Sequence, residues 1–384
     1  MSARAALALA PLLALAACSR APSGSKRETQ PAPVAAIPRA DKLFCVDVDG
    51  SGRELLAGAD GADLWLADLG RDGARVRFRD SGPGVPQLVT AGDFGRGRRL
   101  YVARGAPDEE KPGLTPAVVV QEIDPKTGAS VELVRVETSR AEAVDLAVVD
   151  VDRDKKPDLA FAYYASNTTV ESRDVRADGT TKAGAPERTA QARAHADVDG
   201  DGIDDAIVGR LYGEGPGAAQ GDLRVDMGSG WVTVPTGGGV RAVAAQREAD
   251  GKSTIYFADG WTADYGRHAR AQIKRATWNG AAFDVELVGT SPTDSTFAAI
   301  TPLHAPSGAE SVVGVGNVGV TLFESATGAR PFVSTALGPP AKGVAACRVD
   351  RRDSAVAGGD GAASFTLWAP GDPPHEVAKP RPAP

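Results

Sequence analysis

The residues best suited to chemistry lie in one short acidic stretch, Asp197 to Gly209. Positions 1, 3, 5 and 9 of this loop are Asp197, Asp199, Asp201 and Asp205. Hard cations such as Ca²⁺ take about 6 to 8 oxygen ligands, and carboxylates at alternate positions supply most of them. The backbone carbonyl of Ile203, at position 7, would add another. The spacing predicts a calcium site; a solvated turn rich in Asp and Gly is the alternative.

The loop resembles the first part of an EF-hand calcium loop. Gly202 stands at position 6, where such loops turn sharply and a positive φ is favoured. The glutamate expected at position 12 is missing, because that residue is Val208. An apolar run at 206–208 follows and predicts a strand, so the cation would brace a turn between strands.

Two other loops repeat the pattern. The third loop along the chain carries carboxylates at all four positions: Asp150, Asp152, Asp154 and Asp158. Lys156 there stands at position 7, and Lys155 replaces the glycine of position 6, at a cost of about 1 kcal/mol if its φ is positive. The first loop is incomplete and offers Asp47, Asp49 and Ser51. We therefore expect one to three structural calcium ions that stiffen turns.

Composition bounds the class of protein. The chain has 384 residues, 42% of them hydrophobic, which is enough for a large core or two ordinary domains. The net charge of -7 argues against a nucleic-acid partner. With 45 Gly and 27 Pro, short strands and turns are favoured over helices. We expect a monomer.

The amino terminus predicts export. Arg4 precedes an apolar run at 5–15 that is too short to span a bilayer. Leu15-Ala16-Ala17-Cys18 resembles the lipobox of bacterial lipoproteins, which implies a signal peptide over 1–17 and lipidation of Cys18. An ordinary secretory signal is the alternative. Residues 18–40 read as a flexible tether, and the mature protein is expected at the bacterial cell envelope, held by its acyl anchor on the periplasmic or surface face of the outer membrane.

Repeats organise the remaining chain. Loops of this kind start near residues 47, 93, 150, 197, 248, 306 and 350, at intervals of about 44 to 58 residues. Each is preceded and followed by short apolar runs that predict strands. Four strands per repeat match the blade of a β-propeller. We therefore predict an all-β, seven-bladed propeller of four-stranded antiparallel blades with very little helix, over 41–372, and a Pro-rich tail over 373–384.

These repeats resemble the FG-GAP/VCBS family, which builds propellers such as the integrin α-subunit head. Phe94-Gly95 and Gly105-Ala106-Pro107 match the two halves of the family name. The acidic loops at 150 and 197 match its calcium loop. The resemblance implies a binding scaffold whose calcium ions are structural.

Two cysteines remain after Cys18. Cys45 and Cys347 occupy nearly equivalent positions in the first and last repeats, which a closed ring makes neighbours. Disulfides persist in exported proteins. We expect a Cys45–Cys347 bridge worth about 5 kcal/mol in the chain-entropy treatment; two separate buried thiols are the alternative.

The function predicted is non-catalytic binding of a protein or glycan at the cell envelope. No recognisable catalytic motif occurs, and His195 reads as a strand residue near the propeller axis. The best candidate ligand surface is a loop with Trp261, Tyr265, Arg267 and His268. A lectin-like propeller is one alternative, favoured if Trp65, Trp231 and Trp368 are exposed in equivalent pockets. A polysaccharide lyase or hydrolase is another, favoured by a central funnel lined by ionisable residues.

Overall fold

The computed structural model describes most of the chain beyond residue 39. The described residues are 40, 42–70, 73–106, 116–211, 221–260, 271–291, 297–304, 310–316, 319–325, 333–338, 343–349, 352–358, 365–368 and 375–377. The chain divides into two compact units, Met1–Val34 and Ala35–Pro384, and every described residue belongs to the second. The predicted signal peptide, Cys18 and the predicted ligand surface at 261–270 lie outside the described residues.

The described residues form strands and no helix. The strands fall into seven antiparallel sheets, here called blades 1 to 7 in chain order. Blade 1 contains β1 (Lys42–Val46), β2 (Leu55–Asp60), β3 (Asp63–Gly70) and β4 (Gly73–Ser81). Blade 2 contains β5 (Val85–Gly92), β6 (Arg99–Ala106), β7 (Ala117–Ile123) and β8 (Ser130–Glu137).

Blade 3 contains β9 (Ala143–Val149), β10 (Asp158–Tyr164), β11 (Thr169–Val175), β12 (Thr181–Ala183) and β13 (Glu187–Arg188); the last two both pair with β11. Blade 4 contains β14 (Ala190–Ala196), β15 (Asp205–Arg210), β16 (Leu223–Asp226) and β17 (Trp231–Val234). Blade 5 contains β18 (Ala242–Arg247), β19 (Ser253–Asp259), β20 (Gln272–Trp278) and β21 (Phe283–Thr290).

Blade 6 contains β22 (Phe297–His304), β23 (Glu310–Gly316), β24 (Gly319–Glu324) and β25 (Val333–Gly338). Blade 7 contains β26 (Gly343–Val349), β27 (Arg352–Gly358), β28 (Phe365–Trp368) and β29 (His375–Val377). Because β29 pairs with β28, blade 7 runs past the predicted boundary at residue 372, and the predicted tail at 373–384 contributes its outer strand.

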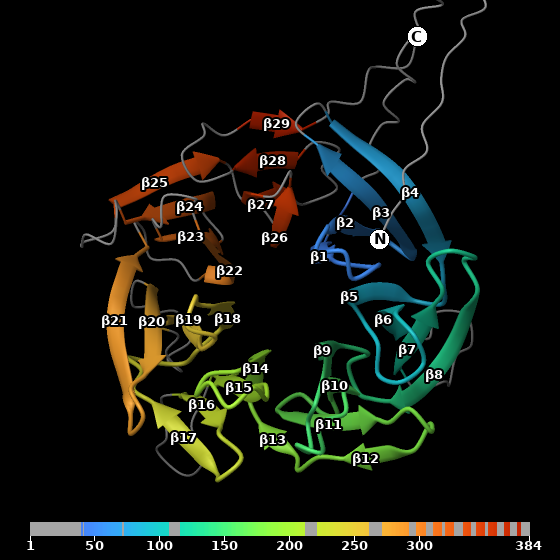
Figure 1. Ribbon diagram of the computed structural model, residues 1–384, viewed down its shortest axis with the longest axis horizontal. Coiled ribbons are helices and arrows are strands. Elements are labelled where there is room, and N and C mark those ends of the chain that lie inside the picture. The colour runs from blue at the N-terminus through green and yellow to red at the C-terminus, as the bar shows by residue number, and fades with distance from the viewer. Residues whose placement is uncertain are drawn as a thin grey trace, which may run out of the picture. The chain divides into compact units, whose positions relative to one another are not determined.

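The blades are arranged in a ring (Figure 1). The first strand of each blade contacts the first strand of the next, and β1 contacts β26 where the ring closes. The prediction of an all-β propeller with four-stranded antiparallel blades is confirmed. Among the described residues, none belongs to a helix long and apolar enough to cross a bilayer.

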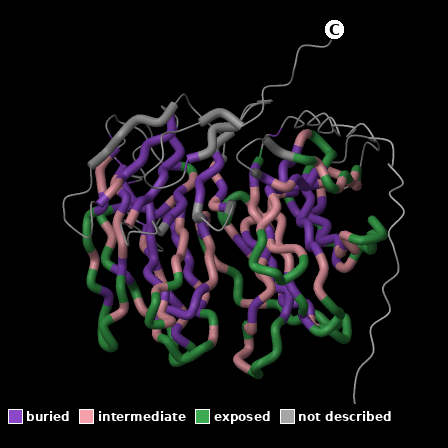
Figure 2. The backbone as a smooth tube through the Cα atoms, turned by 45° about the horizontal axis from the view of Figure 1, so that its top comes forward, coloured by how far each residue is buried: buried purple, intermediate pink, exposed green. Residues whose placement is uncertain are grey.

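The core lies between the blades. Residues of a strand point alternately to the two faces of its sheet, and in the inner strands of a propeller both faces are covered by neighbours. In β10 every residue is buried: Phe161 and Tyr163 join the apolar cluster with blade 2, whereas Ala162 and Tyr164 join that with blade 4. Figure 2 shows buried residues along the strands and exposed ones at the loops.

A disulfide joins the two ends of the ring. Cys45 on β1 and Cys347 on β26 are bonded, with their Cα atoms 5.3 Å apart and 302 residues between them in sequence. The predicted bridge is confirmed. It ties blade 1 to blade 7 at the interface where the ring closes.

Candidate calcium loops and a polar pocket between blades 3 and 4

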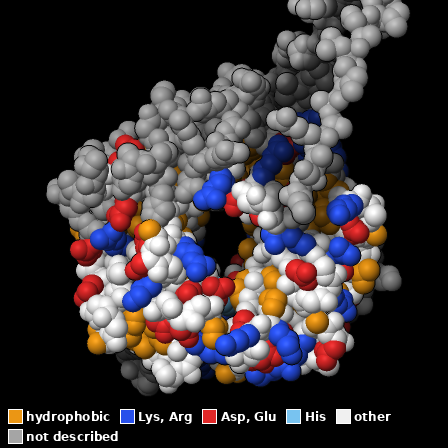
Figure 3. Space-filling model, in the orientation of Figure 1, with side chains coloured by type: hydrophobic (Ala, Val, Ile, Leu, Met, Phe, Trp, Pro, Cys, Tyr) orange, Lys and Arg blue, Asp and Glu red, His pale blue; other side chains and the backbone are white. Residues whose placement is uncertain are grey.

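Each acidic loop joins the first strand of a blade to the second. The loop of blade 4 connects β14 to β15, and the loops of blades 1 and 3 occupy the same place. Because the blades repeat, the loops form equivalent turns around the ring. Figure 3 shows Lys and Arg side chains interspersed with Asp and Glu on the described part of one face, around a central opening.

The loop of blade 4 gathers three carboxylates. One oxygen from each of Asp197, Asp199 and Asp205 lies within 4.8 Å of the others, and Asp197 and Asp205 are buried. Asp197 accepts hydrogen bonds from the backbone amides of Gly200 (2.7 Å) and Gly202 (3.0 Å). Gly202 has a φ of +87°, the positive value predicted for position 6. This group has the charge and oxygen donors that calcium prefers.

An arginine from the neighbouring blade reaches the same loop. The Arg153 guanidinium pairs with Asp201 Oδ2 (2.9 Å) and Asp205 Oδ1 (2.6 Å). Asp201, a predicted ligand, thus lies outside the three-carboxylate group. Its Oδ1 accepts a hydrogen bond from the amide of Ile203 (2.8 Å). The loop therefore already attracts one cationic group across the boundary between blades 3 and 4.

Burial governs the acidity of Asp205. Removal from water is the largest cause of a raised pKa, and the charge of Asp199 adds to it. The Val198 amide and Arg153 oppose the rise, and the pKa that results is about 6. Burial favours the neutral form of such a carboxyl group, and a cation beside it favours the charged form. The residues present thus fit a divalent cation.

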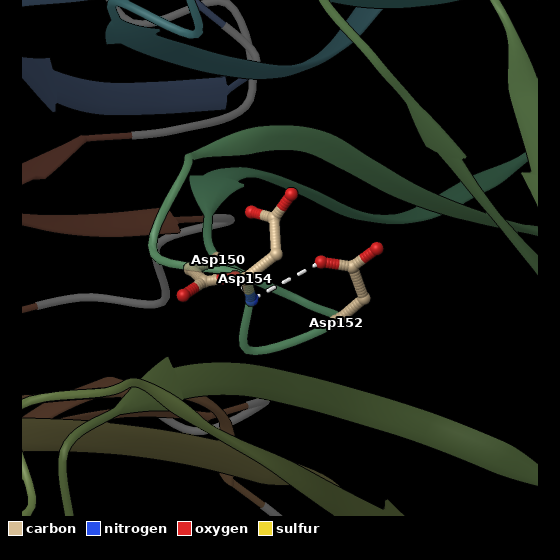
Figure 4. Close-up of side chains that lie close together, drawn as sticks. All are labelled: Asp150, Asp152 and Asp154. Carbon is tan, nitrogen blue, oxygen red and sulfur yellow. Dashed lines mark hydrogen bonds between the residues drawn. The ribbon is translucent and has the colours of Figure 1, made fainter.

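The loop of blade 3 forms the second group. Oxygens of Asp150, Asp152 and Asp154 lie within 4.8 Å of one another, and Figure 4 shows the three side chains along one turn. The Asp154 amide donates to Asp152 Oδ1 (3.3 Å), the dashed line in Figure 4. Lys155 has a φ of +65°, so the strain expected at position 6 is present.

Three charged residues in or beside this loop make it differ from the loop of blade 4. Arg176 pairs with Asp152, and Lys156 Nζ lies 3.9 Å from Asp154 Oδ2. Asp158, a predicted ligand, begins β10 outside the three-carboxylate group. Burial, reinforced by the charge of Asp152, raises the pKa of Asp158 to about 6. Cationic side chains already compete for the carboxylates of this loop.

The loop of blade 1 is closed by hydrogen bonds. Asp47 accepts from the amides of Gly50 (2.8 Å) and Gly52 (3.0 Å), and Asp49 from that of Ser51 (3.0 Å). Arg98 of blade 2 donates through Nε to the Asp47 carbonyl (3.0 Å). Within the described residues, three-carboxylate groups occur only in the loops of blades 3 and 4.

A polar pocket of about 430 Å³ lies between blades 3 and 4. At its inner end, His195 Nε2 lies 2.7 Å from Asp145 Oδ2, and Arg193 Nε lies 3.4 Å from the same oxygen. Burial raises the pKa of Asp145, but His195 and Arg193 together bring it below the usual value. His195 is on the innermost strand, β14, as predicted.

The sequence interpretation missed this pocket, although the sequence contains evidence for it. Asp145 interrupts the apolar strand β9. Arg193 and His195 are two positions apart on β14, so their side chains lie on one face of the sheet. Charged residues on the covered face of an inner strand require buried partners. Which neighbouring strand supplies those partners depends on the order of the blades.

The tryptophans correct one alternative. Trp65 and Trp368 are buried, with 1% and 3% of their surface exposed, and belong to the cores beside blades 1 and 7. Trp231 is 44% exposed and lines the pocket between blades 3 and 4. The condition that would favour a lectin-like propeller, three tryptophans exposed in equivalent pockets, is therefore not met. Outer strands of a propeller also pack against neighbouring blades, which accounts for Trp65 and Trp368.

Comparisons with known proteins report on the fold. No family model matches the chain, and no curated protein matches it in sequence. The solved structure titled the structure of Pseudomonas aeruginosa periplasmic gluconolactonase, PpgL, is similar with a TM-score of 0.54 and 14% identity, covering 88% of this chain and 99% of that one. Saccharomyces cerevisiae Sqt1 is similar with a TM-score of 0.53 and 10% identity, covering 87% and 83%. At such identities the likeness concerns architecture alone, and the chain is a β-propeller.

Proposed function

We propose that the protein is a calcium-stabilised, non-catalytic propeller that binds a protein or glycan partner at the bacterial cell envelope, where a lipid on Cys18 anchors it. The observation that carries the calcium part is the group formed by Asp197, Asp199 and Asp205. Two of these three carboxylates are buried, and their oxygens lie within 4.8 Å of one another. Like charges held this close in the interior repel each other unless a cation joins them.

The position of the loops supports a structural role for the cation. They are turns between the first two strands of a blade, and the strands after them begin with the buried carboxylates Asp158 and Asp205. A cation there links the ends of two strands in one blade. It is held at a turn, next to the pocket lined by His195 and Asp145, whose lining includes Val151 of the blade 3 loop.

Thermal unfolding with and without calcium tests this proposal. A ligand that binds only the folded state stabilises it by about 2.7 kcal/mol at a concentration 100 times its Kd. We expect 1 mM calcium to raise the Tm of the chelator-treated protein and magnesium to raise it less. An unchanged Tm would sink the calcium proposal.

A matched pair of variants locates the effect. Asp199→Asn removes a carboxylate from the blade 4 group, whereas Asp49→Asn removes the equivalent residue from the blade 1 loop. We expect Asp199→Asn to lose a large part of the calcium-dependent stabilisation and Asp49→Asn to keep it. Equal losses in the two variants would show that the blade 4 loop is not the principal site.

A further inference from the structure

Two small residues from facing blades line the pocket between blades 3 and 4. They are Ala160 on β10 and Ala206 on β15, and Phe161 lies beside Ala160 in the lining. Ala206 pairs in register with His195 on one side and with Asp226 on the other, and Asp226 pairs with Trp231. A row of side chains thus runs across blade 4 from the inner strand to the outer one, with a gap at its centre.

Three buried polar atoms make no hydrogen bond, and they belong to residues that line this gap. Arg193 is 8% exposed at its side chain, and its Nε makes no hydrogen bond, although it lies 3.4 Å from Asp145 Oδ2. Glu187 accepts from Arg193 Nη1 (3.0 Å) through Oε1, but Oε2 is unpartnered. Arg224 Nε is buried and likewise makes no hydrogen bond, although it lies 3.8 Å from Asp222 Oδ1. Such groups carry a desolvation cost that a ligand with matching donors and acceptors removes.

The charges in the pocket argue against a simple anion. Its fixed cations are Lys182, Arg193 and Arg224, and its carboxylates are Asp145, Asp174, Glu187 and Asp226. Asp145 and Glu187 are already paired with Arg193. A free anion would meet more negative than fixed positive charge. The unmet groups are instead two donors and one acceptor, which an uncharged ligand with several hydroxyl groups satisfies together.

An aromatic platform stands at the rim. Trp231 is 44% exposed, and the guanidinium of Arg224 lies 5.4 Å from its ring centroid, which holds the indole in place. An exposed indole offers an apolar face beside polar groups. The pocket volume of about 430 Å³ lies within the range of small-molecule sites, roughly 300 to 1,000 Å³.

We infer that this pocket binds an uncharged saccharide, with a sugar ring stacked on Trp231 and hydroxyl groups bonded to Glu187, Arg193 and Arg224. The inference deepens the proposed binding function by giving it a site and a ligand class. It does not depend on calcium in the loops, so the two proposals fail separately: one through the calcium dependence of Tm, the other through sugar binding measured in excess calcium.

The test is a titration of the purified protein, labelled with ¹⁵N at the tryptophan indoles. The probes are the methyl glycosides of glucose, galactose, mannose, fucose and N-acetylglucosamine, with inorganic phosphate as the anionic comparison. The indole resonance of Trp231 is assigned by its loss in Trp231→Phe. We expect at least one glycoside to shift this resonance saturably, and phosphate to leave it in place.

Variants separate this site from others. Trp231→Ala should weaken binding of that glycoside by roughly tenfold or more, as expected for an aromatic residue at the centre of a contact. Glu187→Gln, which replaces the free acceptor by an amide, should weaken it too. Leu287 is an apolar side chain of similar exposure on β21 of blade 5, and the variant Leu287→Ala should bind like the parent.

Three results would overturn the inference. The first is no shift with any of the five glycosides. The second is unchanged affinity in Trp231→Ala, which would place sugar binding elsewhere. The third is a saturable response to phosphate alone, which would make the pocket an anion site. Because Trp231 is 44% exposed and lies on the outermost strand of its blade, we expect its replacement to leave the fold intact, and circular dichroism melting checks this.

Discussion

The two interfaces of blade 3 are built differently. Towards blade 2, twelve buried apolar residues form one cluster that includes Phe161, Tyr163 and Tyr101. Towards blade 4, the buried apolar cluster has five members, and the remaining interface is the polar pocket. The same strand, β10, contributes Leu159, Phe161 and Tyr163 to the cluster with blade 2, but only Ala162 and Tyr164 to the cluster with blade 4. Apolar burial therefore holds blade 3 to blade 2 more strongly than to blade 4.

Ion pairs between side chains join blades 3 and 4, where apolar packing is less extensive. Across the boundary between blades 3 and 4, Asp145 pairs with Arg193 and His195, and Arg153 pairs with Asp201 and Asp205. The two three-carboxylate loops belong to these two blades. The comparison teaches that one interface supplies stability and that the other is held by polar contacts which leave space for a ligand.

The largest effect should come from the apolar interface. Phe161→Ala removes a buried ring, 1% exposed, that stacks on Tyr163 at 5.7 Å between centroids. We expect a loss of about 3 to 5 kcal/mol in the free energy of unfolding by urea. Trp231→Ala at the polar interface should cost less than about 1 kcal/mol. Equal costs would remove the distinction between the two interfaces.

The next effect concerns the buried charges. Asp145→Ala leaves His195 and Arg193 without their shared carboxylate in the interior, and we expect a cost of about 3 kcal/mol in urea unfolding. Glu132→Ala breaks the exposed pair with Arg135 on blade 2 and serves as control, with a cost below about 1 kcal/mol. If both variants unfold like the parent, the polar network does not hold blades 3 and 4 together.

A smaller gain is expected in the loop of blade 3. Lys155 adopts a φ of +65°, which costs an L-residue with a Cβ about 1 kcal/mol relative to glycine. Lys155→Gly should therefore raise stability by about that amount in chelator, and make this loop more like that of blade 4. A decrease in the midpoint of urea unfolding would show that the side chain of Lys155 contributes more than the strain removes.

The smallest effect is a pH dependence at Asp174 in the pocket. Burial raises its pKa, while Lys182, His195 and Arg193 oppose the rise. The folded state then binds more protons than the unfolded state, so this group lowers stability as the pH rises from its unfolded pKa, about 3.9, through its folded pKa. Asp174→Asn should raise Tm slightly at pH 7 and leave it unchanged near pH 3. A Tm gain of the same size at both pH values would contradict this origin.

Local patterns in the sequence were sufficient for much of this structure. The spacing of the acidic loops predicted the repeat, and the equivalent positions of Cys45 and Cys347 predicted the bridge. The chemistry of position 6 predicted the positive φ of Gly202 and the strain at Lys155. Each of these depends on neighbours in sequence or on the closure of a ring.

Contacts between blades were harder to predict. Nothing in the loop of blade 4 indicates that Arg153, from the preceding blade, takes Asp201 and Asp205 as partners. The pocket arises because β10 and β15 face each other with alanines, and the sequence of one strand does not show what stands opposite. For the same reason the sequence left open whether Trp65 and Trp368 are exposed, and the structure shows that neighbouring blades cover them.

Hydrogen exchange measured by mass spectrometry, with calcium and with chelator, tests the central claim that calcium braces the weakly packed pair of blades. We predict that chelator lowers protection in peptides covering 143–175 and 190–210, in blades 3 and 4. Peptides covering 99–106 and 117–123 in blade 2 should keep theirs, because apolar burial holds them. Equal loss around the whole ring, or no loss in blades 3 and 4, would contradict the account.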